Sequence, residues 1–218
     1  MLAVGQSDYI TAGMPPLPHT DAELQVIQQY VPVESLLTLK GSEATVDRVI
    51  NELPGMSWVH FCCHGHQDVG NQPLKSSLHL HDGPLEILDL TQMDIKSPNF
   101  AFLAACQTSA GGVFPCMFNP EHIQSLMNLL LAIEMPDEAM HIAAGFQFAG
   151  FRSIISTIWT IRDKDGPRLA EQVYCHLFRD QGRTPNATEA GEALGLAIRR
   201  LKMDIPVERL VPFVHIGV

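Results

Sequence analysis

Two short apolar runs, at residues 59–65 and 100–108, constrain the fold of this chain more than any other feature. Each run delivers one reactive side chain near its end, His64 in the first and Cys106 in the second. Continuous apolar runs of this length are typical of parallel strands that are buried on both faces. Because the carboxyl ends of parallel strands meet at one edge of an open sheet, we expect His64 and Cys106 to meet there.

The segments around these runs alternate between helical and strand patterns. Helical spacing follows Thr20 and Ser42, both residue types that favour a helix N-cap. Further strands are predicted at 35–39, 153–160 and 212–216, a hairpin around Asp82 and Gly83, and helices at 89–95, 137–148 (ended by Gly150), 165–178 and 188–201. This alternation predicts a single α/β domain over residues 1–218, with a mainly parallel sheet.

Composition limits which binding partners and which cellular compartment the sequence suggests. The chain has 218 residues, 46% of them apolar and 17% charged, which indicates a globular protein with a substantial core. A net charge of −10 argues against nucleic acid or an anionic membrane as the main partner. The five cysteines are odd in number and two of them are adjacent, which favours reduced thiols over a disulfide framework. We therefore expect a cytoplasmic protein without a membrane span.

A thiol beside an imidazole can form a cysteine nucleophile. A thiol attacks a carbonyl carbon well only as the thiolate, so Cys106 needs a neighbouring base, and histidine suits this role near neutral pH. The N–H groups of Gly65 and Cys106 are candidate donors to the oxyanion that such an attack creates. The alternative is a buried thiol that packs as a small hydrophobic side chain, and strand-end placement alone leaves both interpretations open.

A cluster of histidines and cysteines at residues 60–66 raises the question of a zinc site. Strand alternation places His60, Cys62 and His64 on one face and Cys63 on the other, and the sequence offers no second Cys/His pair with ligand spacing. We therefore predict no metal site and no cofactor.

Several strings, taken in order, resemble the CHAT family of caspase-like domains, especially its fungal members. They lie at residues 15–18, 60–65, 77–83, 103–108, 136–139, 149–153 with Trp159 and Asp163, and 212–217. Together they cover nearly the whole chain. The resemblance implies a caspase-hemoglobinase-like fold, a three-layer sandwich in which helices flank a mainly parallel central sheet.

The resemblance also implies a role for particular residues. His64 matches the general base, Cys106 the nucleophile and Gly65 the oxyanion glycine of a cysteine endopeptidase with protein or peptide substrates. Asp82 and Asp163 match family positions at which substrate contact and turn capping are alternative roles.

Trp159 is predicted to line the substrate pocket or the core. In this family, tetratricopeptide repeats normally precede the domain, so a longer or partner chain with such repeats is an expected partner. The family suggests a regulatory pathway of the cell-death or defence type.

Two other function classes compete with the peptidase. One is a catalytically silent caspase-like module that acts through protein partners. The other is a non-proteolytic α/β hydrolase, against which the absence of a G-x-S-x-G string argues.

The chain departs from the family pattern at residues 113–135, an insertion of 23 residues without Lys or Arg. An extra helix is one interpretation, because Asn119 and Pro120 are good helix-start residues. A gating or activation loop beside the nucleophile is the second. The third is a short intron translated in frame, because the segment begins with valine, whose codons start with GT.

Overall fold

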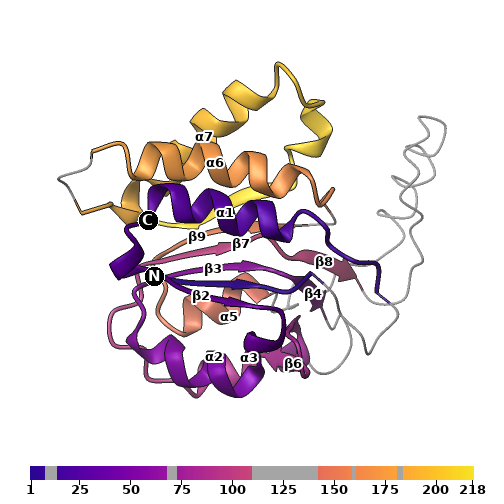
Figure 1. Cartoon of the computed structure of the whole chain (residues 1–218), viewed down its shortest axis with the longest axis vertical. Helices are drawn as coiled ribbons and strands as arrows, with labels where there is room; N and C mark the ends of the chain where they lie inside the picture. The colour runs from indigo at the N-terminus through magenta and orange to yellow at the C-terminus, as the bar shows by residue number, and fades with distance from the viewer. Residues whose placement is uncertain (8–13, 68–72, 110–141, 159–160, 181–183) are drawn as a thin grey trace.

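A six-stranded sheet forms the middle layer of the molecule (Figure 1). The computed structural model describes residues 1–7, 14–67, 73–109, 142–158, 161–180 and 184–218. The sheet has the order β10-β9-β7-β3-β1-β2, and every neighbouring pair is parallel except β10 with β9. Its strands are β1 (Leu2–Gly5), β2 (Leu37–Lys40), β3 (Trp58–Cys62), β7 (Phe100–Leu103), β9 (Ser153–Thr157) and β10 (Phe213–Gly217).

Helices cover both faces of this sheet (Figure 1). One face packs against α1 (Thr20–Tyr30), α6 (Asp165–Leu177) and α7 (Ala190–Leu201), and the other against α2 (Val46–Glu52), α3 (Ile87–Thr91) and α5 (Ile142–Phe148). The predicted three-layer α/β sandwich is confirmed. Among the described residues, no helix is long and apolar enough to cross a membrane.

Side-chain alternation along the central strands divides the interior into two cores. In β3, Trp58 and Cys62 belong to the core under α1, α6 and α7, whereas Phe61 belongs to the core over α2, α3 and α5. Cys63, just after β3, also belongs to the second core. Fully burying one such large apolar side chain contributes about 1.5–3 kcal/mol. Because both faces of these strands are buried, apolar residues occupy nearly every position and form the continuous runs seen in the sequence.

A second, four-stranded sheet with the order β6-β5-β4-β8 continues from the carboxyl ends of β3 and β7. Its strands are β4 (His64–Gln67), β5 (Ser77–His79), β6 (Pro84–Glu86) and β8 (Cys106–Ser109). The antiparallel pair β5–β6 confirms the hairpin predicted around Asp82 and Gly83. The sequence pattern did not predict the remainder of this sheet, because β4 and β8 are too short and too polar to stand out.

Several element boundaries differ from those expected. The N-cap of α2 is Thr45, whose hydroxyl accepts a hydrogen bond from the Arg48 amide, and not Ser42. The N-cap of α1 is His19 and not Thr20 as expected. Thr20 is the first residue of the helix and is buried. Gly150 does follow the end of α5 with φ of 95°, a left-handed conformation that favours glycine.

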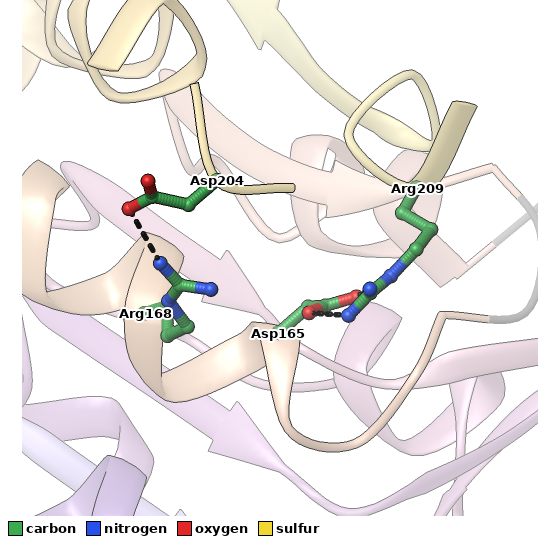
Figure 2. Close-up of polar contacts among 4 residues, drawn as sticks. All are labelled: Asp165, Arg168, Asp204 and Arg209. Atoms are coloured by element: carbon green, nitrogen blue, oxygen red, sulfur yellow. Dashed lines mark hydrogen bonds and ion pairs between the residues drawn. The ribbon is translucent and has the colours of Figure 1, made fainter. Parts of the chain in front are cut away.

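The start of α6 is tied to the loop before β10 by two Arg–Asp pairs (Figure 2). Arg209 binds both carboxylate oxygens of Asp165, with Nε donating to Oδ2 at 2.8 Å, and only 1% of the Asp165 side chain is exposed. Arg168 donates to Asp204 at 3.1 Å, but these side chains are 42% and 68% exposed. The first pair is therefore the stronger of the two links between α6 and this loop.

We predict that Arg209→Ala lowers the free energy of unfolding by about 3 kcal/mol, because it leaves the buried Asp165 carboxylate without its cation. Arg168→Ala is the matched control and should cost less than about 1 kcal/mol, since its pair is exposed to water. Urea denaturation of both variants measures the difference. Equal losses would contradict the assignment.

Candidate active site

His64 and Cys106 follow the ends of the neighbouring parallel strands β3 and β7 and lie opposite each other. Phe61 of β3 pairs with Leu103 of β7, and three residues further along both strands His64 of β4 pairs with Cys106 of β8. The register is therefore unchanged across the break between the large and the small sheet. The backbone positions of these two residues are adjacent, as the apolar runs predicted.

Pro15 fixes the tautomer of His64. Nε2 of His64 lies 2.8 Å from the carbonyl oxygen of Pro15. A carbonyl oxygen only accepts, so Nε2 carries the hydrogen and Nδ1 of the neutral ring is the basic nitrogen. Burial lowers the pKa of His64, while the Pro15 carbonyl and the Asp163 carboxylate act in the opposite direction. His64 is thus a neutral base near pH 7, which is the form that accepts a proton.

Sequence reasoning treated residues 15–18 only as a family string and missed this contact. A proline-rich segment favours an extended backbone whose carbonyl groups have no internal partners, and such a segment is a ready acceptor. This is the only local feature of the sequence that indicates a hydrogen-bonding role for the Pro15 carbonyl. Its partner, His64, lies 49 residues away.

A small pocket lies beside His64 at the carboxyl ends of β3 and β7. It has room for about one water molecule, with a volume near 10 Å³. It is lined by residues from α1 and the segment before it, from the ends of β3 and β7, and from the first turn of α6 and the loop before it: Leu17, Thr20, Glu23, Cys62, Cys63, Ala104, Ile161, Asp163 and Gly166. Two carboxylates in so small a space make it an acidic pocket.

Asp163, one of the predicted substrate-contact residues, binds His19. Its Oδ2 accepts a hydrogen bond from the His19 amide at 2.8 Å and lies 2.7 Å from Nδ1 of the His19 ring. The Asp163 side chain is 23% exposed and that of His19 is 47% exposed, so solvent reaches this pair. Asp163 is therefore available at the mouth of the pocket.

A buried network holds the other carboxylate. Oε1 of Glu23 lies 3.1 Å from Nε2 of His60, and Nδ1 of His60 lies 2.9 Å from the hydroxyl of Tyr174. Burial raises the pKa of Glu23, while the His60 partner opposes that shift. At Gly166, a Cβ atom would lie 2.5 Å from Oε2 of Glu23, so only glycine leaves room for this carboxylate.

Three metal-ligand types converge in the same place. Side-chain atoms of Glu23, His60 and Cys62 lie within 4.8 Å of one another, and this is the one such group within the described ranges. Each already has a protein partner, since Cys62 donates its thiol hydrogen to the Val4 carbonyl at 3.4 Å. Burial raises the pKa of Cys62 well above its usual value, so the sulfur of the metal-free protein is a thiol. The donor set fits a hydrogen-bonded core cluster better than a metal centre.

The remaining predicted site residues lie in different places. Gly65 is in β4, beside the pairing of His64 with Cys106. Oδ1 of Asp82 accepts a hydrogen bond from the Val46 amide at 2.8 Å, so it caps α2, the alternative role considered for it. Trp159 and the insertion at 113–135 lie outside the described residues, and their predicted roles stay predictions.

A second imidazole faces the site from the small sheet. His79 pairs with His64 across β4 and β5, and its ring centroid lies 6.2 Å from that of His66. Burial and the neighbouring His66 and His64 lower the pKa of His79 to about 4. His79 is therefore uncharged at neutral pH.

Comparison with known proteins connects this geometry to a family. The profile of the CHAT domain matches residues 1–201. The structure is similar to the Arg-specific cysteine proteinase gingipain R (13% identity, TM-score 0.53) and to the complex of Porphyromonas gingivalis RgpB pro- and mature domains (11%, 0.52). Each match covers 99% of this chain but only 45% and 46% of the gingipain chains, so this chain spans less than half of their length. The likeness shows a shared fold. No curated protein matches the sequence.

The lowered pKa values of His64 and His79 predict that stability falls as the pH drops from 6.5 to about 4. In this interval the unfolded chain binds protons that the folded protein excludes, so the free energy of unfolding rises with pH. His79→Gln should flatten this slope in urea denaturation at a series of pH values. An NMR titration should give a pKa of about 4 for His79 and below 6.5 for His64. A wild-type slope in the variant would contradict the assignment.

Proposed function

The chain belongs to the CHAT domain family, and from this premise we propose that it is a cysteine endopeptidase. The observation that carries the proposal is the register that pairs His64 with Cys106. Nδ1 of His64 takes the thiol proton, and the sulfur attacks the carbonyl carbon of the scissile peptide bond. The oxyanion that forms accepts hydrogen bonds from the Gly65 and Cys106 amides.

Collapse of this intermediate breaks the C–N bond, and the imidazolium of His64 gives its proton to the leaving amine. Water then attacks the thioester, with His64 again accepting a proton. The acid product leaves, and the proton returns to the Cys106 sulfur. Pro15 supports both half-reactions, because its carbonyl stabilises the imidazolium and holds the ring at Nε2.

Asp163, the part-exposed carboxylate at the mouth of the small pocket, supports a preference for a basic side chain before the scissile bond. Asp163 already holds the imidazole of His19, and a lysine or arginine side chain would take that place. The similar gingipain structure is of an Arg-specific proteinase, which agrees with this preference. Trp159 is proposed as a further part of the substrate pocket.

The biological setting follows the same proposal. The protein would act on protein or peptide substrates in a regulatory pathway of the cell-death or defence type, in the cytoplasm, with tetratricopeptide repeats in a longer or partner chain. The alternative is a catalytically silent module that signals through partners, and it differs from the peptidase in one respect: it does not need Cys106.

Cys106→Ala should abolish cleavage of peptide substrates, because it removes the nucleophile. Cys175→Ala is the matched control, since this half-buried cysteine lies on α6, away from the pocket. Cleavage is followed by mass spectrometry on a library of peptides. Undiminished cleavage by Cys106→Ala, or no cleavage by the wild type under any condition, would favour the silent module.

Asp163→Asn should lower kcat/KM for peptides with arginine before the scissile bond by about ten- to a hundredfold, the value of one charge-assisted hydrogen bond. Peptides with an uncharged residue at that position should lose much less. Asp21→Asn is the control, because this exposed carboxylate pairs with Lys40 and lies outside the pocket. Equal losses for both peptide types would contradict the assignment of Asp163.

A further inference from the structure

The Ala105–Cys106 peptide bond is the point at which the large sheet passes into the small one. β7 ends at Leu103, the Ala104 amide donates to the Phe61 carbonyl at 2.8 Å, and β8 begins at Cys106. Ladder hydrogen bonds therefore hold the chain on both sides of the break. The carbonyl oxygen of the peptide group within the break has a further contact, from outside the β4–β8 ladder.

Thr157, at the end of β9, supplies that contact. Its hydroxyl donates a hydrogen bond to the Ala105 carbonyl oxygen, with 2.6 Å between Oγ1 and O. Thr157 is 1% exposed and Ala105 is 4% exposed, so water does not compete for this bond. A short, buried hydrogen bond of this kind has a fixed direction.

This bond acts on the group that the proposed mechanism uses. The peptide unit is planar, so a fixed C=O direction at Ala105 also fixes the direction of the Cys106 N–H on the other side of the same plane. A hydrogen bond accepted by the oxygen also polarises the N–H of the same amide and makes it a better donor. The nucleophile lies on this same residue.

We propose that Thr157 is a positioning residue of the active site, which aims the Cys106 amide at the oxyanion through its hydrogen bond to the Ala105 carbonyl. This inference rests on the proposed peptidase function. Thr157 touches neither the substrate nor the reacting atoms, and it acts only through the peptide group that it holds.

The bond itself can be observed without any activity. Ala105–Cys106 is the only Ala–Cys pair in the sequence, so carbonyl-13C alanine combined with 15N-cysteine labelling gives a single cross-peak in a carbonyl–amide NMR correlation. In Thr157→Val, which removes the hydroxyl but keeps the shape, the carbonyl signal should move upfield. Thr157→Ser should keep it in place, and so should Ser156→Ala, a change at the preceding buried residue of β9.

Measurements of kcat and KM distinguish a positioning role of Thr157 from a purely structural one. Thr157→Val should lower kcat about tenfold with KM changed less than twofold, part of the hundredfold or more that a lost oxyanion donor costs. Thr157→Ser and Ser156→Ala should keep the wild-type kcat. Urea denaturation establishes that each variant is folded, and Thr157→Ala replaces the valine variant if that one does not fold.

Each result has one meaning. An unmoved carbonyl signal in Thr157→Val, or a moved signal with unchanged kcat, overturns the positioning role while the peptidase function stands. A wild-type protein that cleaves no peptide overturns the proposed function, and the positioning role falls with it. The proposal holds only if the signal moves, kcat falls and serine restores both.

Discussion

The common register of β3 with β7 and of β4 with β8 is the constraint on which the rest of the site depends. Two buried parallel strands pass from one sheet into another without a relative shift of a single residue. Because side chains alternate between faces, a shift by one residue would exchange the cores and separate His64 from Cys106. The apolar side chains that bury β3 and β7 on both faces are therefore also what pairs the two reactive residues.

The pocket beside this pair depends on buried polar contacts that apolar packing alone does not supply. The contact between His60 of β3 and Glu23 of α1 links this helix to the sheet. The Asp165–Arg209 pair holds the first turn of α6, which lies next to Asp163 and contains Gly166. Such groups are costly to bury without partners, and each one here has a partner in another element. They specify how the helices sit on the sheet, and so they shape the acidic wall of the pocket.

Local apolar patterns predicted the mainly parallel sheet, its central strands and the neighbouring backbone positions of His64 and Cys106, and the family resemblance implied the three layers. The sequence did not predict the acceptor for His64 or the hydrogen bond on the Ala105 carbonyl. Pro15 and Thr157 reach these groups from 49 and 52 residues away, and no local pattern encodes contacts between such distant segments.

Helix caps show the same limit on a smaller scale. Ser42 had the right chemistry for an N-cap, but α2 begins after Thr45. There the Asp82 carboxylate, from the hairpin between β5 and β6, binds the Val46 amide. A tertiary contact thus decided between two acceptable local starts. The family resemblance supplied the roles of individual residues, which spacing alone left open.

The rate of Cys106 alkylation by iodoacetamide, followed by mass spectrometry, tests most directly whether the two strands form a working pair. Cys175 in the same molecule serves as the internal reference. If His64 activates the thiol, His64→Ala slows alkylation of Cys106 at pH 7 by about tenfold or more and leaves Cys175 unchanged. Equal rates for Cys106 in the wild type and in His64→Ala would contradict the account.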